Sequence, residues 1–467
     1  MEMGGMKGIG LIIQIVLARL LAPDDFGTIA IVLAFVNIAM VFVDSGLNNA
    51  LIQKKDAGKL DFSTVFYSSL AIAAFFYLLI YALAPVIANF YNDSYLVRII
   101  RVLALILVPG ALSSVQNAYI SKNMLFKKLF KIKITAVLLS GAMGIITAYL
   151  GMGVWALVAY NLGSQISTTL IMWFSVKWRP SLKFSFERFK SLFSFGGKLL
   201  LASLIHTLYV DLRTLVIGRI YSPDTLGYYN RGESVPKTIS SVISGSIQAV
   251  MFPTLSSLQD DKSNLKRVVR RSIKTISFLV FPAMAGLAVI SEPFISLILG
   301  EKWLPAVPFM QIFCVSAAFE MLDSANYQAI NALGRSDINL KLEIIKKIIG
   351  ITILAISIAF GIYAIALGYV ISSIINVLIH MITNKGIYGY RAYEQLGDIM
   401  PSLLLSLAMG TLVYLIGFID LSPWLLMIVQ IGAGALIYSA LAKLFKVESW
   451  DYLSLTVKDI VRKRRAG

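Results

Sequence analysis

The sequence predicts an all-α polytopic membrane protein with about fourteen transmembrane helices. Three observations predict this class: 58% of the 467 residues are hydrophobic, only 14% are charged, and long apolar runs recur along the whole chain. A soluble protein has roughly a quarter charged residues, and a membrane-spanning helix needs about twenty apolar ones. We place the spans near residues 3–21, 28–50, 63–88, 97–119, 130–150, 154–176, 192–218, 226–250, 273–299, 307–332, 344–361, 363–383, 399–419 and 422–443.

The positive charge of the chain gathers in alternate loops. The 42 Lys and Arg residues exceed the 25 Asp and Glu residues and give a net charge of +17. Loops rich in Lys and Arg stay on the cytoplasmic side of a membrane, so both termini are expected to be cytoplasmic. The charge therefore indicates topology rather than binding of nucleic acid. Most of the basic residues fall within 54–59, 122–133, 177–190, 262–274, 335–347, 385–391 and 443–465.

The composition argues against an enzyme. Cys314 is the single cysteine, and His206 and His380 are the two histidines, so neither a disulfide framework nor the usual zinc ligand sets can form. No loop between spans is long enough for a catalytic domain, and no nucleotide-binding P-loop motif is present. We expect no catalytic residues, no resident cofactor and no metal. The tail from Trp450 to Arg465 mixes apolar and basic residues and is expected to lie on the cytoplasmic leaflet.

Two sequence motifs occur twice. Residues 19–27 read RLLAPDDFG and residues 219–227 read RIYSPDTLG, while residues 153–157 (GVWAL) are similar to 361–365 (GIYAI). Six spans separate the copies, so the two halves have the same orientation. A parallel repeat predicts two six-helix lobes around a central cavity, with two further helices at the C-terminus. The predicted parts are an N-lobe at 1–176, a cytoplasmic linker at 177–190, a C-lobe at 191–383, the last two spans at 384–445 and a basic tail at 446–467.

The eighth span carries a polar stripe. Its members recur every three or four residues, which places them on one helical face, and Glu233 and Lys237 are spaced to form an ion pair. Such a face is expected to line the cavity or, alternatively, to make hydrogen bonds between packed helices. The stripe consists of Asn230, Ser234, Lys237, Ser241, Ser244 and Gln248.

Other ionisable residues lie inside spans, where they are costly and usually face a cavity or a partner. Lys198, His206, Tyr209 and Arg213 share part of the seventh span's circumference, and Asp211 lies on its other side. His206 is either a structural, hydrogen-bonded residue or a proton carrier. In the fourth span, Arg98 and Arg101 either bind an anionic headgroup or extend to the interface. Hydroxyls and amides suit sugars, and Arg and Lys suit phosphate.

Three acids stand within spans. Asp44 lies in the second span, and Glu320 and Asp323 lie in the tenth. A buried carboxylate can carry a coupling proton or hold Na⁺. Alternatively, each pairs with Arg213 or Lys237 across the interface.

The chain resembles the Wzx-type polysaccharide or oligosaccharide-lipid flippases, which belong to the multidrug/oligosaccharidyl-lipid/polysaccharide exporter superfamily. The resemblance covers nearly the whole chain, although each motif alone is weak. The residues that carry it are Leu17–Gly27, Asp44–Leu47, Ala50–Gln53, Leu226–Arg231, Tyr327–Ala329 and Leu333–Arg335.

This resemblance implies a bacterial inner-membrane protein that moves an undecaprenyl-diphosphate-linked oligosaccharide to the outer leaflet by alternating access. Membrane lipid and a polysaccharide polymerase are the other expected partners. Two other functions stay open: a proton- or sodium-coupled multidrug exporter of the same fold, and a membrane polysaccharide polymerase. For the flippase, the diphosphate is assigned to Arg98, Arg101, Lys198, Arg213 and Lys237, the glycan to Asn230, Ser234, Ser241, Ser244, Gln248 and Tyr209, and ion coupling to Asp44, Glu320 and Asp323.

Overall fold

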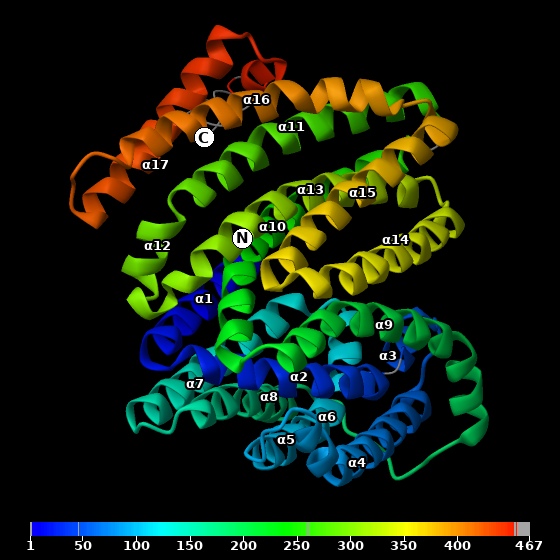
Figure 1. Ribbon diagram of the computed structural model, residues 1–467. Helices are drawn as coiled ribbons and strands as arrows, with labels where there is room; N and C mark the ends of the chain where they lie inside the picture. The colour runs from blue at the N-terminus through cyan, green and yellow to red at the C-terminus, as the bar shows by residue number, and fades with distance from the viewer. Residues whose placement is uncertain (1, 45, 259–260, 453, 455–467) are drawn as a thin grey trace, which may run out of the picture. The chain divides into compact units, whose positions relative to one another are not determined.

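The computed structural model describes residues 2–44, 46–258, 261–452 and 454, and those residues form helices and connecting loops without a β-strand (Figure 1). Each of the fourteen predicted spans falls on a helix or on two consecutive helices, so the predicted all-α class is confirmed. By contacts, the chain divides into two compact units, Met1–Gly227 and Tyr228–Gly467.

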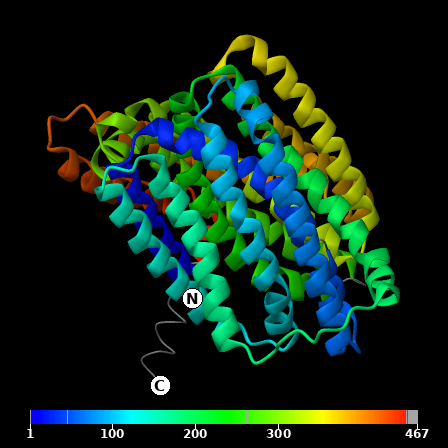
Figure 2. The same cartoon turned by 90° about the horizontal axis from the view of Figure 1, so that it is seen from below.

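The first unit is built from long helices, and many of them pack against helices that are not their neighbours in the chain. Figure 2 shows α1 beside α7, and α2 and α4 each pack against α9. Its helices are α1 (Glu2–Leu20), α2 (Pro23–Asp44), α3 (Leu47–Gln53), α4 (Lys59–Phe90), α5 (Leu96–Leu103), α6 (Leu107–Lys122), α7 (Phe126–Tyr149), α8 (Val154–Ser175) and α9 (Phe186–Ile220).

The two copies of the repeated turn meet in this unit. A Cβ added to Gly27 would lie 2.6 Å from the carbonyl carbon of Pro223, and one added to Gly227 would lie 2.9 Å from the carbonyl carbon of Pro23. In both cases the carbonyl oxygen is nearer still. Each turn therefore presents its glycine to the proline of the other, and the two backbones approach more closely than any side chain would allow. We call this reciprocal contact the glycine clasp.

The second unit begins within α10 and places α11 between α13 and α16. A core of Phe278, Leu405, Met409, Val413 and Tyr438 joins α11, α16 and α17. The helices are α10 (Pro223–Ser256), α11 (Lys262–Val289), α12 (Ser291–Ile298), α13 (Val307–Ala332), α14 (Ser336–Ser357), α15 (Ile362–Tyr388), α16 (Ala392–Ile416) and α17 (Pro423–Leu444).

The structure differs from the predicted boundaries in one instructive place. The basic segment 262–274, expected to be a loop, forms the first turns of α11, because Asp261 caps the helix by accepting hydrogen bonds from the backbone of Ser263 and Asn264.

The helix α9, predicted to begin the C-lobe, packs against α2, α3 and α4 of the first unit. The lobe boundaries themselves stay predictions. Of the predicted basic tail, residues 453 and 455–467 lie outside the described residues.

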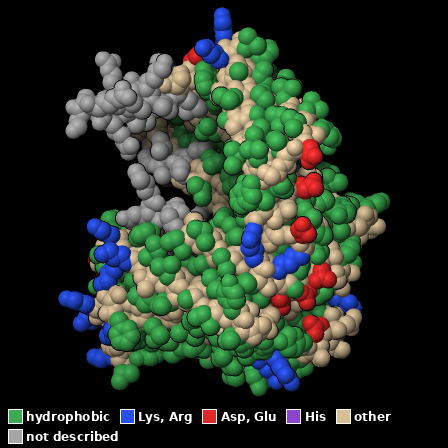
Figure 3. Space-filling view, turned by 90° about the vertical axis from the view of Figure 1, so that its left-hand side faces the viewer, with side chains coloured by type: hydrophobic (Ala, Val, Ile, Leu, Met, Phe, Trp, Pro, Cys, Tyr) green, Lys and Arg blue, Asp and Glu red, His purple; other side chains and the backbone are tan. Residues whose placement is uncertain are grey.

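The surface of the described residues is unusually apolar. Hydrophobic side chains cover most of the face shown in Figure 3, and large ones such as Phe174 and Leu436 are 87% and 74% exposed. Exposed apolar area on this scale requires a partner or a membrane. Ten helical segments of the described chain are long and apolar enough to cross a bilayer, and Gly8–Leu20 is a shorter apolar helix. The chain is a multi-pass membrane protein.

Candidate functional site

The polar face predicted for the eighth span lies on α10. Its hydroxyls bond to their own helix: Ser234 donates to the Arg231 carbonyl at 2.8 Å, and Ser241 donates to the Thr238 carbonyl at 2.8 Å. Ser244 donates to the carbonyl of Ser241 at 3.4 Å. The hydroxyls of Ser234 and Ser244 can still accept hydrogen bonds from a ligand, because a hydroxyl that donates keeps its lone pairs.

The remaining members of the face differ in exposure. The predicted ion pair is confirmed, with Lys237 Nζ 3.0 Å from Glu233 Oε1, and the Lys237 side chain keeps 59% of its surface exposed. Asn230 is half-buried, and the side chain of Gln248 lies outside the described residues. The described part of this face therefore carries neutral polar groups and the exposed Lys237, which is paired with Glu233.

The predicted residues of the seventh span lie on α9. Lys198 and His206 are exposed, and Tyr209 and Arg213 are partly buried. His206 and Asp211 line a polar pocket to which Asp44 also contributes, so the structure brings one coupling candidate together with the seventh span. The four residues of the predicted stripe thus do not all face one described pocket.

The arginines of the fourth span sit on the short helix α5. Arg98 is exposed. Arg101 lies against α4, with its guanidinium carbon 4.1 Å from the centre of the Tyr81 ring and its Nε donating to the Tyr81 carbonyl at 3.4 Å. This cation–π contact fixes Arg101 on the first unit. Its assignment to a diphosphate stays a prediction.

Asp323 is the centre of a buried charge cluster in the second unit. Its Oδ1 lies 2.6 Å from His380 Nδ1 on α15, and its Oδ2 lies 2.9 Å from Lys346 Nζ on α14. Lys346 also lies 2.6 Å from Glu343, which in turn pairs with Lys347 at 3.1 Å. Asp323 thus pairs within its own unit, and not with Arg213 or Lys237 as the alternative expectation held. Glu320, one turn earlier on α13, is half-buried.

Sequence reasoning did not assign His380 or Lys346 to a site. His380 is fully buried, and Lys346 is 5% exposed although it was counted among the loop residues that set topology. A usable signal was present: polar residues stand at helical spacing on both α13 and α15, and Asn384 donates to Asn326 at 2.7 Å one turn from the Asp323–His380 contact. Two facing polar rows in apolar helices indicate contact between those helices.

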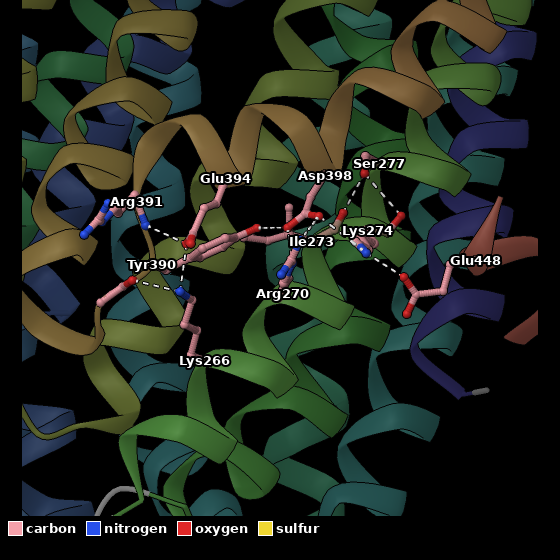
Figure 4. Close-up of polar contacts among 11 residues, drawn as sticks. Lys266, Arg270, Ile273, Lys274, Ser277, Tyr390, Arg391, Glu394, Asp398 and Glu448 are labelled. Carbon is pink, nitrogen blue, oxygen red and sulfur yellow. Dashed lines mark hydrogen bonds and ion pairs between the residues drawn. The ribbon is translucent and has the colours of Figure 1, made fainter.

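A second charged network links α11 to α16 and to the segment after α17 (Figure 4). Asp398 accepts two hydrogen bonds from Arg270, at 2.5 and 2.9 Å, and one from the Tyr390 hydroxyl at 2.8 Å. Lys274 bridges Asp398 at 3.4 Å and Glu448 at 2.5 Å. Burial, together with the adjacent carboxylate, raises the pKa of the Tyr390 hydroxyl above its usual range, so it remains a donor. The network holds α16 against α11.

Comparison with known proteins decides the family. The model of the polysaccharide biosynthesis protein family matches residues 16–308, well over half of the chain. The chain belongs to this family. Its relatives include the lipopolysaccharide biosynthesis protein WzxC of Escherichia coli, 28% identical over 86% of this chain and 84% of WzxC. The teichuronic acid biosynthesis protein TuaB of Bacillus subtilis is 26% identical over the same shares.

Solved structures confirm the fold expected for the family. The Lipid II flippase MurJ in an inward closed conformation superposes with a TM-score of 0.77 at 17% identity, over 95% of this chain and 97% of MurJ. An inward-facing multidrug resistance transporter of the MATE family, in the MOP superfamily, gives a TM-score of 0.65 at 14% identity, over 82% and 95%. The family model and the sequence relatives confirm the resemblance to the Wzx-type flippases, and the solved structures confirm the fold.

Proposed function

We propose that the protein is a flippase that moves an undecaprenyl-diphosphate-linked oligosaccharide across the membrane by alternating access. The observation that carries this proposal is the match to a flippase fold over nearly the whole of both chains, joined to membership of a polysaccharide biosynthesis family. The MATE fold also matches, but over less of the chain and with a lower TM-score. That difference favours a lipid-linked substrate over a soluble drug.

The proposed setting is the inner membrane of a bacterium, with both termini in the cytoplasm. The alternation of basic loops supports this topology, because the positive-inside rule would otherwise be broken at every second loop. The oligosaccharide would then leave on the outer leaflet, where a polysaccharide polymerase is the partner that consumes it.

The headgroup is proposed to use the cations and the polar face predicted from the sequence. Lys198 and Arg98 in the first unit, and Lys237 in the second, each have an exposed side chain that a phosphate can reach. The amides and hydroxyls of α10 suit the hydroxyls of the glycan, which both donate and accept. The undecaprenyl tail would stay in the bilayer throughout.

We also propose that transport is coupled to an ion gradient. Among the described residues, the Asp323 cluster is the site that best suits a coupling proton. Within the described residues, the Nε2 atom of His380 is buried and has no hydrogen-bond partner, while Nδ1 contacts Asp323. A proton added at Nε2 would charge a site that already holds Lys346, Lys347 and two carboxylates. Because charge is expensive in such surroundings, protonation would change how α13, α14 and α15 pack together.

The test is transfer of a labelled lipid between leaflets. Purified protein in liposomes would receive fluorescent undecaprenyl diphosphate carrying an oligosaccharide, with and without a proton or a sodium gradient. Faster transfer than in protein-free liposomes supports the flippase, and acceleration by a pH gradient supports coupling. Export of cationic dyes without any lipid transfer would show that the proposed function is wrong.

A further inference from the structure

An apolar groove lies on α11 in the second unit, between α13 and α16. It has a volume of about 430 Å³, and its lining residues lie within 281–289, 314–319 and 403–414. On α16 these residues run from Leu403 to Tyr414, which covers about 16 Å at 1.5 Å per residue. The hydrocarbon core of a bilayer is about 30 Å thick, so the groove has the depth of one leaflet.

A second pocket joins the groove where α11 and α16 end. It shares Val289 and Tyr414 with the groove and has a volume of about 400 Å³. We call it the acidic pocket, and its lining residues lie within 289–304 and 414–430. The basic segments that are proposed to face the cytoplasm stand at the opposite ends of both helices. Under the proposed topology, the acidic pocket therefore lies at the outer leaflet.

The charge of the acidic pocket favours a cationic group. Glu292 and Glu301 line it with exposed side chains, and neither carboxylate has a hydrogen bond or ion pair within the described residues. Lys302 is the one Lys or Arg in the two segments that form the pocket, and it is not among the lining residues. A diphosphate placed here would meet two carboxylates, whereas a primary ammonium would bring a positive charge and three hydrogen-bond donors.

The base of the acidic pocket has the same preference. Gln430 on α17 lines it and is 4% exposed. Its Nε2 donates to the Val413 carbonyl at 3.3 Å, and its Oε1 has no hydrogen-bond partner within the described residues. The partial negative charge of that oxygen is not offset by a donor, so it adds to the field of the two carboxylates even without touching a ligand.

The apolar groove is open to lipid. Leu407 and Val315 line it and keep 56% and 45% of their surfaces exposed. Tyr414 lines both pockets and is 58% exposed, at the level where the groove gives way to acidic groups. Tyrosine is enriched at this level of a membrane, where apolar chains meet polar headgroups. The combined shape therefore suits an amphiphile with one apolar chain in the groove and a cationic end in the acidic pocket.

We infer that the two pockets bind one phosphatidylethanolamine molecule of the outer leaflet, with its ammonium group at Glu292 and Glu301 and an acyl chain in the apolar groove. This lipid is neutral overall, because its ammonium offsets its single phosphate, so it can approach the two acids where undecaprenyl diphosphate cannot. The site goes beyond the proposed flippase activity, since its occupant is a resident membrane lipid rather than the transported one. Bound there, the lipid connects α16 and α17 to α11 and α12.

The experiment is native mass spectrometry of the delipidated full-length protein, which counts the lipid molecules that stay bound. Phosphatidylethanolamine, phosphatidylglycerol and undecaprenyl diphosphate are added separately and then in competition. The double variant E292Q/E301Q removes both charges. D420N is the matched control, because Asp420 is an exposed acid between α16 and α17 that does not line the pocket. Ala288→Phe adds bulk to the floor of the apolar groove and leaves both acids in place.

The unaltered protein should bind phosphatidylethanolamine at least about tenfold more tightly than phosphatidylglycerol, because only the first presents an ammonium group. The double variant should lose this preference, and D420N should keep it. Ala288→Phe should weaken binding of phosphatidylethanolamine about tenfold, which tests the groove even if the double variant does not fold. Equal binding of the two phospholipids, or an equal loss in D420N, would overturn the inference. So would displacement of phosphatidylethanolamine by undecaprenyl diphosphate at equal concentration, because the site would then belong to the transported lipid.

Methylation of the headgroup gives an independent readout. Phosphatidylcholine carries the same charge but has no N–H group to donate, so it should bind more weakly than phosphatidylethanolamine. Phosphatidylethanolamine should also raise the melting temperature of the unaltered protein in micelles and leave that of E292Q/E301Q unchanged. An equal rise in both proteins would contradict the inference. These measurements need no lipid transfer, so their failure would leave the proposed function untouched.

Discussion

The glycine clasp predicts that a single added methyl group destabilises the protein. In Gly27→Ala the new Cβ would lie 2.6 Å from the carbonyl carbon of Pro223, whereas carbon atoms in contact lie about 3.5–4.0 Å apart. The obstacle is backbone, so no side chain can rotate away. The starts of α2 and α10 would have to separate by about 1 Å, and we expect a loss of about 1–3 kcal/mol in the free energy of unfolding.

The measurement is unfolding in mixed detergent micelles, followed by tryptophan fluorescence as denaturing detergent is added. Gly286→Ala is the matched control, since Gly286 lies within a helix and a Cβ there meets nothing within 4 Å. It should leave stability unchanged or raise it by up to about 1 kcal/mol. The Gly27→Ala/Gly227→Ala double variant should cost less than the sum of the two single variants, because one separation relieves both contacts. Equal stability of Gly27→Ala and the control would refute the clasp.

Three further outcomes are expected. Asp398→Asn should lower thermal stability more than an ordinary surface substitution, because it leaves the guanidinium of Arg270 without a carboxylate, and an unchanged melting temperature would count against the α11–α16 network. Asp323→Asn should abolish any dependence of lipid transfer on a pH gradient. The control Asp337→Asn removes only the exposed ion pair with Arg335 and should preserve that dependence. The same pH dependence in both variants would contradict the coupling proposal. Hydrogen bonds from Asn264 hold the pKa of the Asp261 carboxyl below its usual value. The stability lost in Asp261→Ala should therefore be largest above about pH 4 and should vanish as the pH falls through the pKa of Asp261 in the folded protein. A loss of stability that does not depend on pH would be inconsistent with the cap.

The helices were predictable because hydropathy reports them directly. A span needs a run of apolar residues, and the alternation of basic loops checks the count independently. The pair between Glu233 and Lys237 was predictable for a similar reason, since residues four apart on a helix are neighbours whatever the tertiary structure.

Partners distant in sequence were not predictable. Asp323 and His380 are 57 positions apart and meet only because α13 packs against α15. Lys346 was predicted to be a loop residue that sets topology. In the sequence, a lysine that marks a cytoplasmic loop cannot be told from one that completes a buried ion pair. Likewise, Asp44 and Ser203 line the same pocket because the backbone at Gly46 lies close to the backbone at Gly196 on α9. That closeness depends on two small residues whose pairing no local pattern indicates.

The glycine clasp also bears on how a chain that carries the same turn twice can hold together. In an interface between two identical subunits, the same patch serves on both sides, so that residue i meets residue j and j meets i. The turns at residues 23–27 and 223–227 have this relation within one polypeptide. The same five-residue motif thus forms both sides of the contact. Two separate copies of such a half could form the same contact as a symmetric dimer, and joining them in one chain would preserve it.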